Sequence, residues 1–325
     1  MPDKLKLAIY WGSGCGGCDV ATLDINEKIL EVDKACEIVL WPLASDPKYK
    51  DVEEMEDDSI DVCLFNGAIR NSENHEMAEL LRKKSKVLVS FGSCAIDGGI
   101  PGLANFFSKD EIFNRVYIES ESTENKNKVI PQTKFDSPEG ELEIPEFYDW
   151  VYTLGDAVDV DYYLPGCPPT PDNIWMAIEA IVSGNLPPKG SVITDTEKCL
   201  CDPCERKKEE KKITEFKRPF EVEEIDKEKC LLEQGLVCCG PVTRAGCGVL
   251  CPNANMGCRG CYGPTEDVMD QGAKLIGAIA STIDSTDPEE VKKISDQLLD
   301  PAGTFYRFSL ANSMLKGKRR GESVS

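Results

Sequence analysis

The sequence has no apolar run of the ~18 residues that a membrane-spanning helix needs. Its first residues, MPDKLKLAIYWGSG, contain neither the apolar core and cleavage site of a secretory leader nor a twin arginine. These absences argue against a membrane span and against export. We therefore expect the chain to act in the cytoplasm.

Positive charge is also scarce. The chain has 37 Lys and Arg against 58 Asp and Glu, which gives a formal net charge of −21. A protein this acidic is repelled by nucleic acid and by anionic membrane surfaces. We therefore expect its partners to be other proteins.

Cysteine, in contrast, is abundant, with 16 among 325 residues. Disulfides do not persist in a reducing cytoplasm, so metal binding is the better explanation for so many thiols. Hydrophobic residues make up 41% of the chain. This composition predicts a globular protein, and the chain is long enough for two domains that each bury a core.

The densest group of cysteines lies between Cys230 and Pro264, where seven of them occupy 35 residues. Thiolates at this density favour zinc or iron-sulfur clusters over oxygen-loving ions. Cys258 and Cys261 are separated by two residues, and Cys247-x3-Cys251 is followed directly by Pro252. The second pattern is typical of bacterial proteins with two iron-sulfur clusters. Two zinc sites of four thiolates each are the alternative.

The first half of the chain predicts an α/β fold. Short apolar runs of strand type alternate with helical patterns, which indicates a parallel, flavodoxin-like doubly wound sheet. The expected strands are 5–11, 37–44, 60–67, 86–92 and 159–166, and the expected helices include 20–36, 71–85 and 171–184. The polar stretch 117–148 is expected to be an exposed insertion.

The glycines after the first strand match G-x-G-x-x-G, which suggests a dinucleotide site. However, the second strand ends in apolar residues, where an acidic residue would bind the ribose. No Lys-Ser or Lys-Thr pair follows the glycines, so the loop is not a P-loop either. We expect its backbone N–H groups to face a cluster instead.

Four other cysteines each lie just after a predicted strand: Cys15, Cys18, Cys94 and Cys167. The carboxyl ends of parallel strands meet at one edge of the sheet, where α/β proteins bind their ligands. Four thiolates at that edge would hold one [4Fe-4S] cluster. A buried, inert thiol is the preferred interpretation for Cys36 and Cys63.

We expect three parts: 1–189 as the flavodoxin-like domain, 190–265 as a small ferredoxin-like domain with two clusters, and 266–325 as C-terminal helices and tail. The expected helices of the last part are 272–285 and 287–299. Clusters would substitute for an insufficient hydrophobic core in the small domain.

These patterns together resemble the small subunit of cytoplasmic [NiFe] hydrogenases. The resemblance is carried by GSGCGGCD (12–19), GSCAIDGG (92–99), PGCPPTP (165–171), the pair Cys201 and Cys204, GLVCCGPVTRAGCGVLCP (235–252) and GCRGCYGP (257–264). It is strongest to the small subunits of the F420-non-reducing (methyl-viologen-reducing) group of methanogens.

The resemblance implies three [4Fe-4S] clusters and no nickel, flavin or nicotinamide in this chain. The cluster nearest nickel would be bound by Cys15, Cys18, Cys94 and Cys167. A medial and a distal cluster would share Cys201, Cys204, Cys230, Cys238, Cys247, Cys251, Cys258 and Cys261, in a division that the spacing leaves open. Cys199 and Cys239 are not needed as ligands in this set, and Cys239 is an alternative to Cys238.

The implied function is electron transfer without bond chemistry in this chain. Hydrogen would be split in a separate large subunit, and electrons would pass to a delta-type iron-sulfur subunit and to heterodisulfide reductase. Some relatives use a histidine at the distal cluster, but the single histidine here, His75, is expected at the surface of the first domain. Lys207 stands where a nickel-binding pattern would need a second cysteine.

Three alternatives stay open. The chain could serve a hydrogenase that reduces coenzyme F420 or sulfur compounds, or it could be an electron-transfer subunit like those of respiratory NADH dehydrogenase. The third is a zinc-stabilised nucleotide-binding module, which the missing acidic residue and phosphate lysine disfavour.

Overall fold

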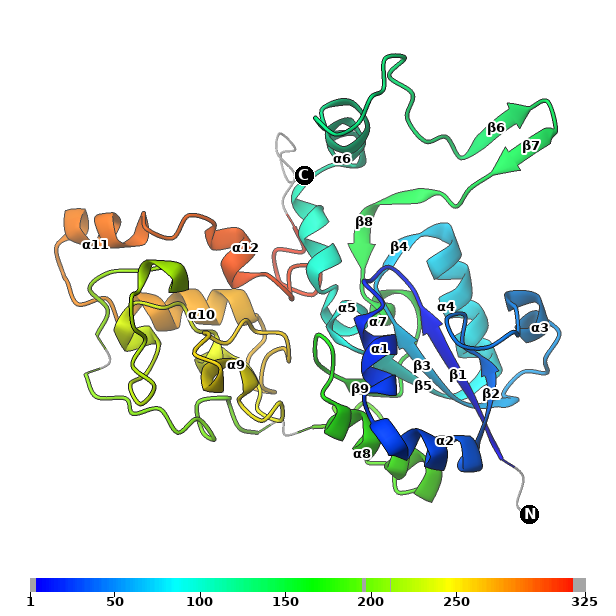
Figure 1. The fold of residues 1–325 in the computed structure, drawn as a ribbon, viewed down its shortest axis with the longest axis horizontal. Coiled ribbons are helices and arrows are strands. Elements are labelled where there is room, and N and C mark those ends of the chain that lie inside the picture. The colour runs from blue at the N-terminus through cyan, green and yellow to red at the C-terminus, as the bar shows by residue number, and fades with distance from the viewer. Residues whose placement is uncertain (1–3, 195–196, 211, 318–325) are drawn as a thin grey trace.

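A parallel sheet of five strands forms the centre of the first half of the chain. The computed structural model describes residues 4–194, 197–210 and 212–317. The strands lie in the order β2-β1-β3-β5-β9, which is the flavodoxin-like order, so the predicted fold class is confirmed (Figure 1). Their bounds are β1 (Leu5–Trp11), β2 (Cys36–Leu40), β3 (Ile60–Asn66), β5 (Ser85–Phe91) and β9 (Tyr162–Leu164).

Both faces of this sheet are covered by helices, which explains why its strands read as nearly continuous apolar runs. One core joins the sheet to α1, α2 and α8. The other core joins it to α3 and α4. The bounds are α1 (Gly17–Leu23), α2 (Ile29–Ala35), α3 (Tyr49–Glu53), α4 (Ser72–Lys84) and α8 (Pro171–Ser183).

The helix predicted over 20–36 is interrupted. α1 ends at Leu23, a short 3-10 helix covers Asn26–Lys28, and α2 begins at Ile29. Asn26 has φ of 57°, a left-handed conformation that asparagine tolerates better than most residues. The break lets the chain bend, so that Ile25 and Val32 both reach the core.

The buried carboxylate of Asp161, just before β9, binds groups from three other segments at this edge of the sheet. Asp161 accepts hydrogen bonds from Arg82 and Lys189, each at 2.6 Å, and from the backbone N–H of Leu88 at 2.8 Å. Burial alone would raise the pKa of Asp161, but Lys189 and then Arg82 outweigh it and lower the pKa. The charged form of Asp161 therefore stabilises the fold.

The predicted insertion projects from the sheet as an exposed arm (Figure 1). It contains a hairpin of β6 and β7 and is flanked by β8, which pairs antiparallel with β4. Side chains on the hairpin and its approach, such as Phe135 and Leu142, are exposed. The bounds are β4 (Ile69–Asn71), β6 (Lys134–Ser137), β7 (Gly140–Glu143), β8 (Phe147–Tyr152), α5 (Ser93–Asp97), α6 (Lys109–Phe113) and α7 (Leu154–Ala157).

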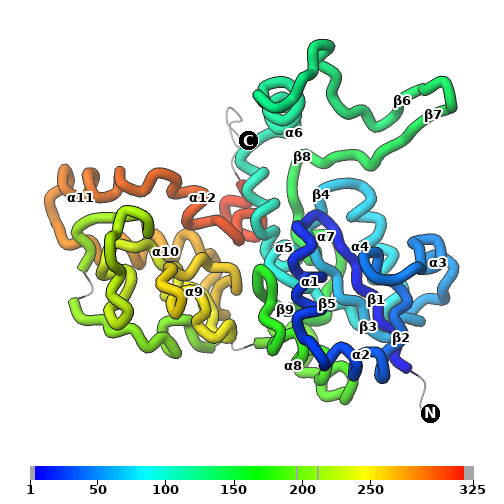
Figure 2. The backbone as a smooth tube through the Cα atoms, viewed as in Figure 1, coloured from blue at the N-terminus to red at the C-terminus, as the bar shows by residue number. Residues whose placement is uncertain are grey.

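The C-terminal part has its own core but little regular structure before its last helices (Figure 2). Between 197 and 265, the described residues form turns, three 3-10 helices and one short α-helix. Its core includes the side chains of Cys238, Cys239 and Cys258. The helices are α9 (Leu250–Asn253), α10 (Gln271–Ala280), α11 (Pro288–Ser295) and α12 (Pro301–Phe305).

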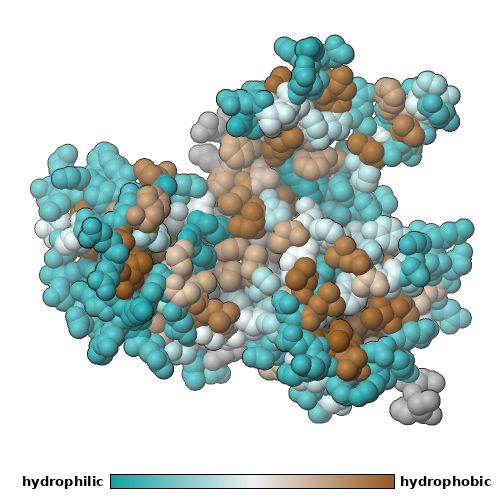
Figure 3. Space-filling view, in the orientation of Figure 1, coloured by the Kyte–Doolittle hydropathy of each residue, from teal (hydrophilic) through white to brown (hydrophobic). Residues whose placement is uncertain are grey.

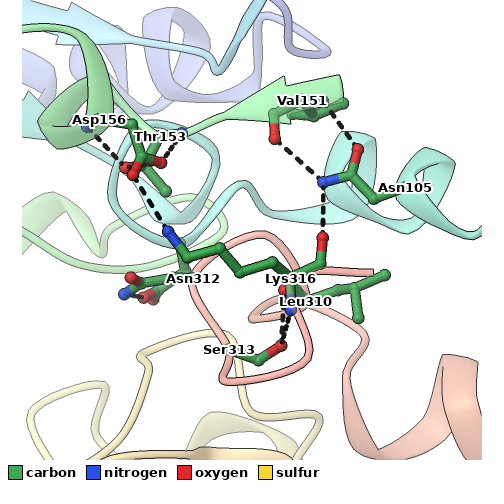
Figure 4. A network of polar contacts seen from close by, with 9 residues as sticks. Asn105, Val151, Thr153, Asp156, Leu310, Asn312, Ser313 and Lys316 are labelled. Atoms are coloured by element: carbon green, nitrogen blue, oxygen red, sulfur yellow. Dashed lines mark hydrogen bonds and ion pairs between the residues drawn. The ribbon is translucent and has the colours of Figure 1, made fainter. Parts of the chain in front are cut away.

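The end of the described chain returns to the first half and ties the two parts together. Asn105 donates to the carbonyls of Val151 and Lys316, at 3.0 and 3.2 Å (Figure 4). Asn312 donates to Asp97 at 3.0 Å. These contacts fix the position of the last residues on the first half. Among the described helices, none has the length and apolar character of a membrane span.

Candidate functional site

The first group of four cysteines meets at the carboxyl edge of the sheet, as predicted. Cys15 and Cys18 follow β1, Cys94 follows β5, and Cys167 follows β9. Burial raises the pKa of the Cys18 thiol, and the neighbouring Cys94, Cys167 and Cys15 raise it further. Burial, Cys167 and Cys15 likewise raise the pKa of Cys94 to about 12. Each thiol is therefore close enough to its neighbours to oppose their ionisation.

Glycines line this group, and a larger side chain would fill the space beside the sulfurs. A Cβ on Gly92 would lie 2.4 Å from the Cys18 Sγ, and one on Gly99 would lie 2.6 Å from the Cys94 Sγ. The N–H of Gly17 donates to the Cys15 Sγ at 3.4 Å. Soft thiols, glycine walls and N–H donors fit an iron-sulfur cluster, whose sulfurs accept such bonds.

Asp19 anchors this group to the sheet, a role that the sequence analysis missed. Its buried carboxylate accepts from Trp41 Nε1 at 2.9 Å and from Asn66 Nδ2 at 3.0 Å. Asn66 also donates to the carbonyl of Tyr10 at 2.8 Å. The carboxylate therefore fixes the start of α1, and with it Cys18, to the sheet. The Cys-Asp pair in GSGCGGCD is the only sequence signal for it.

The second group forms in the C-terminal part from Cys201, Cys204, Cys230 and Cys238. Burial raises the pKa of Cys238, and Cys230 and Cys204 add to the shift. Burial raises the pKa of Cys201 to about 12, and the neighbouring thiols Cys199, Cys238 and Cys230 raise it further. A Cβ on Gly240 would lie 3.3 Å from the Cys201 Sγ and 3.5 Å from the Cys238 Sγ. The structure thus brings these four together.

The third group contains Cys247, Cys251 and Cys261. Burial raises the pKa of Cys261 to about 12, with Cys247 and Cys251 among its neighbours. Cys258 lies beside the second group: burial raises the pKa of its thiol, and Cys238 and Cys239 raise it further. Its backbone N–H donates to the Cys238 Sγ at 3.2 Å.

The remaining cysteines differ in their surroundings. Cys36 and Cys63 are buried in the first half, as predicted. Cys239 is buried beside Cys238 and lies close to Arg259 and Arg307. The backbone N–H of Cys199 donates to Asp202 at 2.8 Å. His75 lies on α4 beside Glu79, 3.8 Å away.

The first and third groups touch each other. Cys167 lies near enough to Cys261 to be among the groups that shift the pKa of its thiol. The adjacent Tyr262 hydroxyl accepts from the N–H of Thr170 at 2.9 Å and from Asn173 Nδ2 at 3.1 Å. Asn173 also donates to the carbonyl of Gly246 at 3.1 Å. We call Thr170, Asn173 and Tyr262 the junction.

Within the described ranges, no three His, Cys, Asp or Glu side chains stand where one metal ion could bind them all. One zinc ion would need its thiolates at about 2.3 Å. A [4Fe-4S] cluster instead binds its four thiolates through four separate irons.

Comparisons with known proteins identify relatives over nearly the whole chain. Residues 15–181 match the family model described as NADH ubiquinone oxidoreductase, 20 Kd subunit. A relative from Archaeoglobus profundus, the iron-sulfur G-type subunit of F420-non-reducing hydrogenase, is 44% identical over 97% of this chain and 98% of its own. The corresponding F420-non-reducing hydrogenase protein from Methanothermobacter thermautotrophicus is 40% identical over 99% of both chains.

Among solved structures, an NAD+-reducing [NiFe]-hydrogenase in the H2-reduced state has a similar chain, with a TM-score of 0.49 and 28% identity over 56% of this chain and 93% of that one. The sequence relatives extend over nearly the whole chain, the cysteine-rich C-terminal part included. This chain therefore belongs to the family of G-type subunits of F420-non-reducing hydrogenases, the small subunits of these oxidoreductases.

Proposed function

We propose that the chain is the electron-transfer subunit of a [NiFe] hydrogenase, carrying electrons from H2 oxidation through three [4Fe-4S] clusters. The observation that carries this proposal is the arrangement of its cysteines in three groups, with Cys167 of the first near Cys261 of the third and the junction joining the two segments. Neighbouring thiol groups of this kind suit single-electron transfer, and four thiolates on each cluster would leave no iron open for bond chemistry.

The proposed ligands follow the three groups. Cys15, Cys18, Cys94 and Cys167 hold the first cluster. Cys201, Cys204, Cys230 and Cys238 hold the second, and Cys247, Cys251, Cys258 and Cys261 hold the third. Cys258 is assigned to the third because its two-residue spacing to Cys261 lets both thiolates share one cluster. When bound, such clusters exchange one electron each at potentials that burial, net charge and N–H···S bonds adjust.

The nickel site is proposed to lie in a separate large subunit that covers the first group. Cys15 is exposed in this chain. The nearby helices α1 and α2 expose Val20, Leu23 and Leu30, each more than half accessible to solvent. Figure 3 shows hydrophobic surface over the part of the first half that holds these helices. An apolar surface beside an exposed ligand suits a permanent subunit interface.

The proposed acceptor is an iron-sulfur subunit of the delta type, with heterodisulfide reductase beyond it, in the cytoplasm. The full-length similarity to F420-non-reducing subunits supports this choice over an F420-reducing or sulfur-reducing hydrogenase. The family model also describes a respiratory subunit, but it ends at residue 181 and leaves out the second and third groups. Those two groups favour the hydrogenase.

Iron analysis tests the proposal directly. The complex, purified without oxygen, should contain about twelve irons in this chain, with nickel confined to the large subunit. Cys94→Ser should abolish H2-dependent dye reduction and remove one cluster, while EPR still detects the other two. Cys36→Ser, at a buried thiol outside the three groups, is the matched control. Fewer than about eight irons in the wild-type chain would contradict the three-cluster proposal.

A further inference from the structure

A cavity of about 770 Å³ opens beside Cys239 in the C-terminal part. Its walls come from three separate segments, 216–221, 236–259 and 297–307. This volume lies within the range of small-molecule sites, which is roughly 300–1,000 Å³. None of the three proposed clusters needs the space, since Cys258 is the one proposed ligand on its wall.

Basic side chains dominate the charge of this cavity, although the chain as a whole is strongly acidic. Lys217 and Arg218 lie on exposed chain, while Arg259 and Arg307 are half-buried. We call these four side chains the basic pocket. Lys217 pairs with Glu215. Arg259 and Arg307 form no ion pair within the residues that the structure describes.

Each of the two carboxylates on the cavity wall accepts a hydrogen bond from a backbone N–H. Glu221 accepts from the N–H of Arg218 at 2.7 Å, and Asp300 accepts from the N–H of Gly303 at 2.9 Å. Burial lowers the pKa of the Arg307 guanidinium and nearby Arg259 lowers it further, while Cys239 and Asp300 raise it by smaller amounts. The two half-buried guanidiniums thus repel each other, and Asp300 offsets that repulsion only in part. An oxyanion would relieve that repulsion through paired N–H···O bonds.

The apolar part of the cavity limits the kind of ligand. Phe216 and Leu298 line it together with the basic pocket. Inorganic anions are too small and too polar to use these walls, whereas an organic anion would bury its carbon skeleton there. We propose that the basic pocket binds a small organic anion, whose phosphate or carboxylate group lies between Arg259 and Arg307.

Such a ligand would add negative charge next to Cys239 and Cys258. If the proposed function holds, this charge makes the cluster bound by Cys258 harder to reduce, because net charge is one determinant of cluster potential. Binding itself does not depend on that function. The two claims can therefore be measured separately.

The test uses the anaerobically purified complex and calorimetric titration at constant ionic strength. The probes are phenyl phosphate, citrate and a hexaglutamate peptide. Phenyl phosphate or citrate should bind once per chain, about tenfold or more weakly in Arg259→Gln and Arg307→Gln, since each loses a charge-assisted contact. Arg115→Gln, at an exposed arginine on the projecting arm, should leave the affinity unchanged. Arg259→Lys and Arg307→Lys retain the positive charge. Anion binding by these two variants shows that the weaker binding of the Gln variants comes from the lost charge and not from misfolding.

Three results would overturn the proposal: no binding of either small anion to the wild type, equal binding in both Gln variants, or binding of hexaglutamate alone. The last would assign the pocket to a protein partner. EPR-monitored redox titration supplies the second readout, with one cluster expected to move to a more negative potential when the anion is present. An iron content far below twelve together with normal anion binding would remove the proposed function and keep the site.

Discussion

Substitution of Tyr262 by Phe tests whether the junction holds the first and third groups of cysteines together. Tyr262 is only 2% exposed, and its hydroxyl accepts two hydrogen bonds, from Thr170 and Asn173. Phenylalanine keeps the ring and removes only this oxygen. The backbone N–H of Thr170 and one N–H of Asn173 then lose their acceptor, while the bond from Asn173 to Gly246 remains.

The magnitude follows from the cost of unpaired buried donors, about 1–3 kcal/mol each. Two such donors, with partial relaxation, give a loss of about 2–4 kcal/mol. The unfolding entropy of a chain of this size is about 0.7 kcal/mol per kelvin, so dividing the lost stability by it gives a fall in the apparent Tm of roughly 3–6 °C. Tyr262 is adjacent to Cys261, so the loosened contact should also weaken the magnetic interaction between the two clusters.

The assay follows visible absorption of the clusters during heating and the EPR spectrum of the reduced complex. Tyr152→Phe is the control, because that ring is exposed on β8. Iron content should be the same in both variants and the wild type. If Tyr262→Phe melts at the temperature of Tyr152→Phe and shows an unaltered EPR spectrum, the junction does not position the clusters and the reasoning is wrong.

Three further substitutions test other parts of the structure. Gly92→Ala should prevent assembly of the first cluster, because the new Cβ would lie 2.4 Å from the Cys18 Sγ. Gly184→Ala is the control, since Gly184 also has a positive φ but faces open space, and it should keep the full iron content. The amount of iron per chain distinguishes the two variants. Asp161→Asn should destabilise the first half by about 2–4 kcal/mol in denaturant unfolding, since two cations lose their partner. The Asp161 pKa is lowered on folding, so its stabilisation should be complete above the unfolded value near about 3.9 and disappear as the pH falls through the folded value; a wild type and variant with parallel pH profiles would refute this. Cys238→Ser should remove about four irons and Cys239→Ser none, and the reverse result would exchange their roles.

The sheet was predictable because buried parallel strands leave a local signal. Each apolar run of the first half, from 5–11 to 159–166, overlaps one strand of the five-stranded sheet. The break at Asn26 was not predictable, since the apolar spacing of a helix continues across it and only the backbone conformation differs. The short helix limits in the C-terminal part were equally hidden, because turns around cysteines carry no periodic pattern.

The cysteine groups were likewise predictable where they depend on neighbouring residues and not where they depend on contacts between distant parts of the chain. That Cys94 and Cys167 follow strands is evident from the sequence, and the parallel sheet then brings them to one edge. The grouping of Cys201 with Cys230 and Cys238 depends on how irregular chain folds back on itself, which spacing does not encode. The junction was missed for this reason as well. Tyr262 and Asn173 lie 89 residues apart, and neither residue type indicates a contact until both are placed in space.

In the irregular chain between 197 and 265, the ionisation of the cysteine thiols and the stability of the fold depend on each other. Cys238, Cys239 and Cys258 are members of the C-terminal core itself, together with apolar side chains such as Leu275. Burial raises the pKa of all three thiols, so ionising them without a metal is costly. Metal ligands must be deprotonated, so metal binding compensates that cost only when the chain is folded around it. If the proposed clusters are bound there, we expect the C-terminal part to fold together with them, with iron-thiolate bonds supplying the stability that regular helices and strands supply in the first half.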